Sequence, residues 1–338
     1  MKILAIETSC DETAAAIVED GIKILSNVVA SSTTMHQKYG GIVPEVAARE
    51  QHRVIMPVIK ETLEQAKLSI DDIDKVAVTI GPGLIGSLLI GVETAKTIAF
   101  VTKKPLIPVN HVIAHMFGNF LSPSQPVEFP VISLVVSGGH TELYLMKSRS
   151  DLTWLGGTLD DAAGEAFDKT ARLLGFGNRG GPAIAAAAAN YPIIQLSNNP
   201  IKLPRPLLYD KTLNFSFSGL KTAVLREWKK QETHDEALVN AFAYEVQEAI
   251  TDVLVAKTIK AAEKYHAQSI LISGGVAANS CLREKLSILN YQFSIHAPSP
   301  ALCTDNAVYI ASCAFFKSKP VDWHDITALP DLSVEENI

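Results

Sequence analysis

Short apolar stretches near the N-terminus have the length and alternation typical of β-strands. Lys2–Thr8, Thr13–Glu19 and Ile22–Ala30 are such stretches, and Asp20-Gly21 between the last two is a typical hairpin turn. We therefore expect three antiparallel strands at the start of the chain.

Alternating helical and strand patterns follow. Apolar residues recur at helical spacing in Glu50–Lys67, Asp71-Asp72 suits a helix N-cap, and Lys75–Ile80 is a continuous apolar run of buried-strand type. After a glycine-rich segment we expect a helix over Ser87–Thr102 and a strand over Leu106–Val109.

The pattern begins again after the turn-rich segment 122–126. Val131–Val136 and Glu142–Met146 predict a hairpin, and Ser269–Ile272 predicts a buried strand that enters a glycine loop and a helix. A largely helical piece, Asp151–Tyr244, is inserted between them. The chain is therefore predicted to be a duplicated α/β protein whose two halves leave a cleft, and such interfaces are preferred ligand sites.

We expect the first half to cover residues 1–126 and the second half residues 127–304, with the insertion at about 151–244. The segment from about 305 to 338 is expected to pack back onto the first half.

Composition excludes several classes of protein. The 338 residues are 47% hydrophobic with a net charge of −6, which argues against disorder. No uninterrupted apolar run approaches the roughly 18 residues of a membrane span, and the run Met1–Ile6 is too short for a signal peptide. We expect a cytoplasmic protein with four reduced cysteines.

The acidic balance gives no global attraction to nucleic acid, but one segment is basic. Residues 200–230 hold seven basic side chains against Asp210 and Glu227. A solvated helix face explains this on charge alone, and an RNA-binding patch is the alternative. The basic residues are Lys202, Arg205, Lys211, Lys221, Arg226, Lys229 and Lys230.

The glycine-rich segment Gly81–Gly86 matches G-x-G-x-x-G between a strand and a helix. The acidic residue of a dinucleotide site is missing, because Val101–Pro105 occupies its place. Ser87 stands where a phosphate loop needs lysine. Neither nucleotide motif is therefore favoured. The glycines indicate only that the backbone can approach a ligand, and the N-terminus of the following helix offers unpaired N–H groups to an anion.

His111 and His115 are spaced i and i+4, which places both imidazoles on one face of a helix. A metal ion would need a third ligand, and Asp305 in a short polar cluster before a helix is a candidate. Two chance histidines and a plain N-cap explain the same residues. The general-base glutamate of H-E-x-x-H is absent, because Val112 takes its place.

Two strand-to-glycine turns, Ser137–Thr141 and Ser273–Val276, fall at equivalent points of the two halves. Their backbone N–H groups and hydroxyls suit a phosphate or a planar base. Tight turns alone would also need these glycines. The repetition favours a nucleotide ligand.

Six motifs in order resemble one family, the TsaD family of tRNA N6-adenosine threonylcarbamoyltransferases, formerly described as O-sialoglycoprotein endopeptidases. The resemblance spans Met1 to about Lys317 and implies an actin-like ATPase fold built from two ribonuclease-H-like halves. The motifs are Ile6–Thr13, Gly81-Pro82-Gly83, His111-x-x-x-His115, Ser137–Leu143, Gly274–Asn279 and Thr304–Ala307.

The resemblance also implies roles for single residues. His111, His115 and Asp305 match the ligands of a divalent metal, iron in preference to zinc. Asp11 and Glu12 match an acidic pair facing the catalytic site. The positions that match the threonylcarbamoyl-adenylate site are Val135, Val136, Ser137, Gly138, Gly139, Asp168, Gly181 and Asn279.

The implied reaction is transfer of the threonylcarbamoyl group from threonylcarbamoyl-AMP to N6 of adenosine 37 in ANN-decoding tRNA. The implied partners are a TsaB-type paralogue, a TsaE-type ATPase and a TsaC-type enzyme that supplies the adenylate. Three alternatives stay open: an actin-like-fold ATPase or kinase, a metallopeptidase, and a noncatalytic scaffold.

Overall fold

A computed structural model describes the chain except for residues 37–38, 40, 122–124, 178–179, 193–200, 289–291 and 335–338. The chain divides into two compact units. The first unit is Met1–Pro126 together with Pro298–Ile338, and the second is Val127–Ala297. The C-terminal segment therefore belongs to the same unit as the N-terminus.

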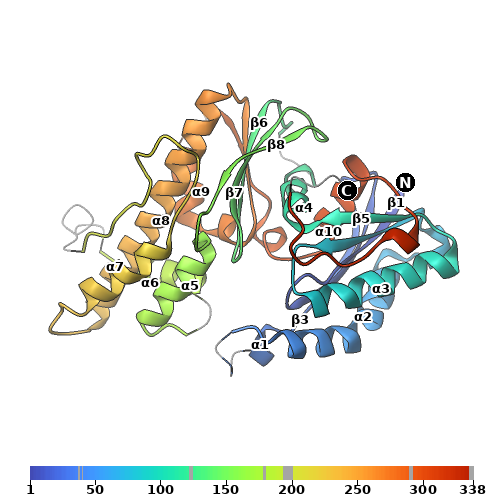
Figure 1. Cartoon of the computed structure of the whole chain (residues 1–338), viewed down its shortest axis with the longest axis horizontal. Helices are drawn as coiled ribbons and strands as arrows, with labels where there is room; N and C mark the ends of the chain where they lie inside the picture. The colour runs from blue at the N-terminus through green and yellow to red at the C-terminus, as the bar shows by residue number, and fades with distance from the viewer. Residues whose placement is uncertain are drawn as a thin grey trace. The chain divides into compact units, whose positions relative to one another are not determined.

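The first unit is built on a five-stranded sheet in the order β3-β2-β1-β4-β5 (Figure 1). The first three strands pair antiparallel, whereas β4 and β5 continue the sheet in parallel with β1. The three expected N-terminal strands are confirmed. The strands are β1 (Lys2–Glu7), β2 (Glu12–Glu19), β3 (Lys23–Ser31), β4 (Lys75–Gly81) and β5 (Leu106–Asn110).

Helices cover both faces of this sheet. Leu4 and Ile6 of β1 belong to one core cluster with residues of α2 (Pro44–Ala66) and α3 (Ile85–Thr102). Side chains alternate along a strand, so the buried Ile3 and Ala5 point to the opposite face. There β1 contacts α10 (Val308–Phe316), which also packs on α4 (His111–Phe117). The short helix α1 spans Thr33–His36.

Two predicted helix starts differ most from the structure. Helix α2 begins at Pro44, six residues before the first residue expected, because proline fits the first turn of a helix, where its missing N–H is not needed. Asp71-Asp72 is not an N-cap. Ser69 caps a 3₁₀ helix over Ile70–Asp72, and the Asp72 carboxylate accepts a hydrogen bond from Ser69 N at 2.8 Å.

By length and composition, α3 passes as a helix that could cross a membrane, with a mean hydropathy of 1.4 over 18 residues. This helix contains no long uninterrupted apolar run, because Glu93 and Lys96 lie among its apolar residues. Leu88, Val92 and Ala95 lie in the core of the first unit. Packing against the sheet thus explains the apolar composition of this face of α3.

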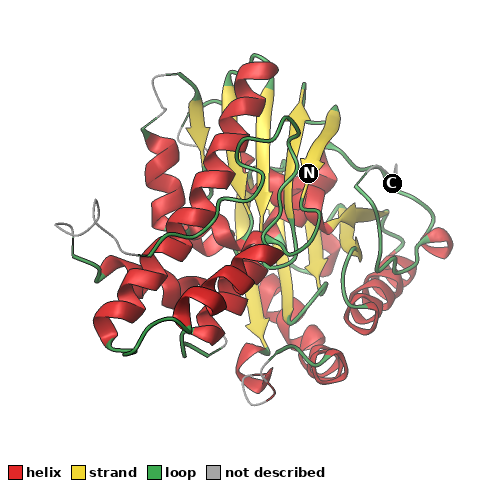
Figure 2. Ribbon diagram, turned by 60° about the vertical axis from the view of Figure 1, so that its left-hand side comes forward, coloured by secondary structure: helices red, strands yellow, loops and turns green. Residues whose placement is uncertain are grey.

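The second unit repeats the sheet of the first. Its order, β8-β7-β6-β9-β10, matches β3-β2-β1-β4-β5 strand for strand, including which pairs are parallel. Figure 2 shows the strands of the structure as yellow arrows among red helices. The duplicated α/β fold is therefore confirmed. The strands are β6 (Val131–Val136), β7 (Thr141–Met146), β8 (Leu152–Gly157), β9 (Ser269–Ser273) and β10 (Ser294–His296).

The segment expected to be a helical insertion begins with β8, which pairs with β7 and completes the repeat. This edge strand exposes Thr153 and Trp154 in succession, so its sequence lacks a clear alternation. Helix α8 contacts β6 and β9, and α5, α6 and α9 pack against it. The helices are α5 (Ala163–Leu173), α6 (Gly180–Ala189), α7 (Ser218–Trp228), α8 (Glu236–Lys264) and α9 (Ser280–Ser287).

Candidate functional site

Helix α4 presents His111 and His115 on one face. Asn110 ends β5 and caps the helix, because its Oδ1 accepts hydrogen bonds from Val112 N at 3.0 Å and Ile113 N at 3.2 Å. The two imidazole centroids lie 4.6 Å apart, and both side chains are buried. The i, i+4 spacing therefore brings the two rings together as expected.

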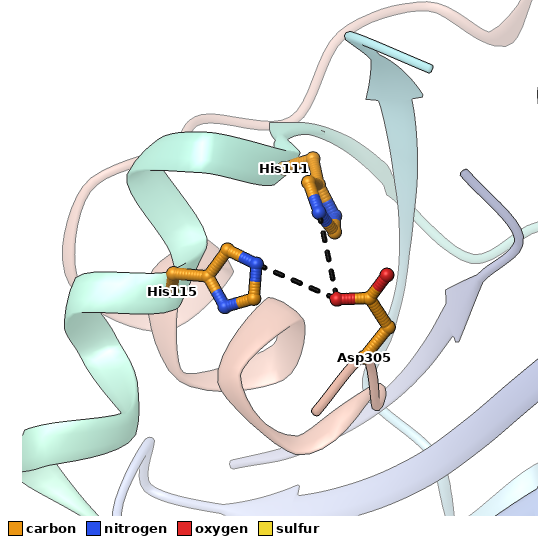
Figure 3. A group of neighbouring side chains, drawn as sticks. All are labelled: His111, His115 and Asp305. Carbon is orange, nitrogen blue, oxygen red and sulfur yellow. Dashed lines mark ion pairs between the residues drawn. The ribbon is translucent and has the colours of Figure 1, made fainter. Parts of the chain in front are cut away.

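Asp305 approaches both histidines from the turn before α10 (Figure 3). Its Oδ1 lies 3.7 Å from His111 Nε2 and 3.5 Å from His115 Nε2, and one donor atom from each residue falls within 4.8 Å of the others. Asp305 is not the N-cap of α10, since Asn306 Oδ1 accepts the hydrogen bond from Val308 N at 3.1 Å.

This donor set fits a divalent metal ion. Two imidazole nitrogens and one carboxylate oxygen are ligands that both Zn²⁺ and Fe²⁺ take in proteins. The Nδ1 atom of His111 donates to Glu7 Oε2 at 3.1 Å, which is how metal-binding histidines are usually oriented. Burial raises the pKa of Asp305, although the charge of His111 opposes this shift. A cation at the site would favour the ionised carboxylate.

The acidic pair Asp11 and Glu12 lies in the same unit, between β1 and β2. Asp11 Oδ2 accepts from Thr33 Oγ1 at 2.9 Å, and Glu12 Oε1 accepts from Ser31 Oγ at 3.0 Å. Burial raises the pKa of Glu12 to about 9, and the negative charges of Asp11 and Asp305 add to this. Glu12 therefore holds its proton at neutral pH in the metal-free protein.

The glycines of the Gly81-Pro82-Gly83 turn are required by packing. A Cβ on Gly81 would lie 1.9 Å from Leu329 O, and one on Gly83 would lie 2.5 Å from Ser9 O. The turn is held by hydrogen bonds from Gly83 N to Pro330 O and from Leu84 N to Ser9 O. A close approach to a ligand was expected here, but the contacts of Gly81 and Gly83 are with the chain itself.

Gly138 and Gly139 in the β6–β7 turn differ from these glycines. A Cβ at either position would meet no described atom within 4 Å, and neither residue has a positive φ. Ser137 closes the turn through Ser137 N to His140 O at 2.8 Å and His140 N to Ser137 Oγ at 3.1 Å. Neither packing nor backbone conformation explains the two glycines, which leaves room for a ligand.

The second glycine turn packs directly on the first. Gly274 has φ +87°, and a Cβ there would lie 2.4 Å from Val136 O. Val135 and Val136 are fully buried, whereas Gly138 and Gly139 are exposed, so a ligand on this turn would meet the glycines rather than the valines. The structure therefore brings both glycine turns of the second unit together.

The other predicted substrate residues make contacts within the second unit. Asn279 Oδ1 caps α9 by accepting from Leu282 N at 3.0 Å, and Asn279 Nδ2 donates to Gln247 Oε1 at 2.9 Å. Asp168 on α5 accepts a hydrogen bond from Gly180 N at 3.0 Å, next to Gly181. Asp168 and the start of α6 thus lie together.

Sequence reasoning gave no role to two residues around the metal ligands. Glu7 contacts His111, and Tyr309 donates a hydrogen bond to Asp305 Oδ1 at 3.2 Å while its ring lies 4.6 Å from that of His115. The sequence marks these two residues only weakly. Glu7 is a charged residue that directly follows a short apolar run, and Tyr309 lies four residues after Asp305.

Comparisons with known proteins place the chain in a family. The family model TsaD, described as tRNA N6-adenosine threonylcarbamoyltransferase, matches residues 23–312. Relatives of that name are 48% identical: the one from Persephonella marina covers 94% of this chain and 91% of its own, and the one from Dehalococcoides mccartyi covers 99% of each.

Among solved structures, HypF from T. kodakarensis has a TM-score of 0.62 at 14% identity, covering 93% of this chain and 47% of its own. This likeness concerns the fold alone, and it confirms the actin-like ATPase fold. The family match over most of the chain shows more: this chain belongs to the TsaD family.

Proposed function

We propose that this chain transfers the threonylcarbamoyl group from threonylcarbamoyl-AMP to N6 of adenosine 37 in tRNAs that read ANN codons. Family membership over nearly the whole length carries the proposal. In the reaction N6 bonds to the carbonyl carbon of the donor, the bond from that carbon to the phosphate oxygen breaks, and AMP leaves. The N6 proton passes to a basic oxygen, of the Asp11 or Glu12 carboxylate or of the donor's phosphate.

We assign His111, His115 and Asp305 to a divalent metal ion, iron in preference to zinc. Their donor atoms and their mutual distances support this assignment. When bound, the ion supplies a Lewis acid that polarises a carbonyl or phosphate oxygen of the donor.

We assign Asp11 and Glu12 to the hydrogen bonds around the reacting groups. Without a bound ion, burial and the negative charges of its neighbours raise the pKa of Glu12 to about 9, so that Glu12 can donate a hydrogen bond to an oxygen of the donor. A cation on the neighbouring Asp305 would favour the ionised form, which accepts one. Asp11 supplies the second carboxyl group of this acidic pair, next to Glu12.

The adenylate is assigned to the glycine turns of the second unit, together with Asp168, Gly181 and Asn279. The open space at Gly138 and Gly139 supports this, since backbone N–H groups there can approach a phosphate or a developing oxyanion. Val135 and Val136, which end β6 and are fully buried, lead directly into this turn.

Mass spectrometry of nucleosides tests the reaction directly. ANN-decoding tRNA is incubated with threonylcarbamoyl-AMP, the chain and its proposed partners, beside a His111→Ala/His115→Ala variant. His324→Ala is the matched control, because His324 is exposed and pairs with Asp322 rather than with a proposed metal ligand. Threonylcarbamoyladenosine is expected from the wild type and the control only. No product from the wild type, with partners that work on a related enzyme, would overturn the proposal.

The proposed partners are tRNA, a TsaB-type paralogue, a TsaE-type ATPase and a TsaC-type enzyme that supplies the adenylate, and the proposed compartment is the cytoplasm. Exposed apolar side chains on α2 and α3 support a protein partner at the first unit. We call this set the partner face: Met56, Ile85, Leu89 and Val101.

A further inference from the structure

Glu7 is a buried carboxylate to which the proposed function gives no role. It ends β1, and the residue is 0% exposed. Removing a carboxylate from water costs free energy unless hydrogen-bond donors surround it. The donors that surround Glu7 therefore indicate what its position accomplishes.

Three segments of the first unit supply these donors. Glu7 Oε1 accepts from Ser9 N at 2.5 Å, and Oε2 accepts from Thr79 Oγ1 at 2.5 Å and from His111 Nδ1 at 3.1 Å. Thr79 lies on β4, the parallel neighbour of β1. Ser9 and Thr79 thus fix the carboxylate on the sheet, independently of its contact with the imidazole.

The contact with His111 determines which ring nitrogen faces Asp305. A carboxylate only accepts hydrogen bonds, so the proton in this bond lies on Nδ1. Ser9 Oγ lies 3.3 Å from the same Nδ1 and shares that proton as a second acceptor. A metal ligand is the neutral imidazole, and with the proton on Nδ1 its lone pair is on Nε2, the atom that lies 3.7 Å from Asp305 Oδ1.

We propose that Glu7 is a positioning residue for the metal centre, holding His111 in the tautomer and ring orientation that present Nε2 to the ion. Carboxylates in this position are a common feature of metal sites, and their loss typically lowers metal affinity by about 10- to 100-fold. The inference rests on the proposed metal centre and adds a residue to it.

Metal affinity of the purified full-length chain tests this role, with Co²⁺ as the probe in competition with a chelator. Glu7→Gln keeps the size of the side chain and removes its charge, and we expect about 10- to 100-fold weaker binding together with a changed Co²⁺ absorption spectrum. Thr79→Val is the matched control, since it removes a donor to the same carboxylate and leaves the contact with His111. Thr79→Val should lose much less Co²⁺ affinity than Glu7→Gln does.

A double-mutant cycle separates positioning from a general structural effect. If Glu7 acts through His111, adding Glu7→Gln to His111→Ala causes no further loss of the residual Co²⁺ affinity. An equal loss in both backgrounds overturns the inference, as does wild-type affinity and spectrum in the single Glu7→Gln variant. Equal Co²⁺ binding by wild type and His111→Ala would instead overturn the proposed metal centre itself.

A measurement on the wild type covers the case in which Glu7→Gln does not fold. In the Zn²⁺-loaded chain, ¹⁵N NMR of the histidine rings should show His111 protonated at Nδ1 and bound to the metal through Nε2. Metal on Nδ1 and a proton on Nε2 would overturn the inference.

Discussion

At the scale of residues, negative charge is concentrated around the candidate metal centre. Burial raises the pKa of Asp305, and the charges of Glu7 and Asp11 add to the shift. The same surroundings raise the pKa of Glu12. The metal-free site therefore holds its carboxyl groups at an electrostatic cost that a divalent cation would reduce.

This cost predicts how stability depends on pH. Burial, and in addition the neighbouring Asp11 and Asp305, raise the pKa of Glu12 to about 9 in the folded metal-free chain. The pKa of an exposed glutamate is about 4.3. The folded state thus binds the Glu12 proton more tightly than the unfolded state does. This proton binding stabilises the folded state, and the stabilisation is lost as pH rises toward 9. We expect the free energy of unfolding to fall above about pH 5, by up to about 1.4 kcal/mol per pH unit.

Glu12→Gln should remove this part of the slope in urea unfolding with a chelator present, because the amide does not titrate. Glu232→Gln, which changes an exposed glutamate, is the control and should leave the slope as it is. A Glu12→Gln slope equal to that of the wild type would show that Glu12 is ionised throughout, and would remove its assignment as a hydrogen-bond donor.

At the scale of elements, two glycine turns that look alike in sequence have different causes. Gly81 and Gly83 are fixed by contact with the backbone of the C-terminal segment and of Ser9. Gly138 and Gly139 contact nothing described where a side chain would lie. The first turn therefore serves packing, and the second is available to a ligand.

Alanine substitutions distinguish the two causes. Gly81→Ala should lower the free energy of unfolding by about 1–3 kcal/mol, the usual range for overpacking, because the new Cβ meets Leu329 O. Gly138→Ala should change it by less than about 0.5 kcal/mol, yet raise the KM for threonylcarbamoyl-AMP. Thermal unfolding and steady-state kinetics of both variants check this. An unchanged KM in Gly138→Ala would argue against the adenylate lying on this turn.

Most strands could be predicted from the sequence, because central strands are continuous apolar runs. Edge strand β8 was not, since it exposes successive residues and carries no alternation. The start of α2 was missed because its first turn lacks an apolar repeat. The helix expected over Ser87–Thr102 is confirmed as α3, which begins two residues earlier, at Ile85. A local sequence pattern therefore does not predict the ends of a helix or strand where tertiary contacts determine them.

At the scale of the whole molecule, the duplication predicted the fold, and the site followed only in part. The spacing of His111 and His115 was readable because one helix carries both. That Asp305 meets them depends on the return of the C-terminal segment to the first unit, which no local pattern encodes. The place of Glu7 depends on the same tertiary contacts.

The partner face predicts a loss of association without a loss of fold. Leu89 is 41% exposed and Val101 69% exposed on α3, so a charge there faces water in the isolated chain. Leu89→Glu should weaken binding of a TsaB-type paralogue by at least about 10-fold, since a charge buried in an interface lacks a partner. Ile288→Glu, at an exposed isoleucine of the second unit, is the control. Calorimetric titration of both variants measures this, and equal affinities would place the paralogue elsewhere.

Fewer basic side chains of residues 200–230 are available to bind tRNA than the charge of this segment suggested. Arg205 is bound to Glu245 and, at 3.1 Å, to Asp252, while Arg226 and Lys230 pair with Glu227. The exposed lysines outside these pairs are Lys202, Lys211, Lys221 and Lys229.

We expect these lysines to contact phosphates, which adds affinity that falls with salt and does not depend on base sequence. A Lys211→Glu/Lys221→Glu variant should bind tRNA more weakly, and the slope of log affinity against log salt should shrink by about 0.7–0.9 per lost contact. Lys319→Glu, in the first unit, changes the net charge as much as each single substitution does and is the control for Lys211→Glu and Lys221→Glu taken singly. If all variants keep the wild-type slope in filter-binding titrations, this segment is a solvated helix face, and tRNA must bind through other residues.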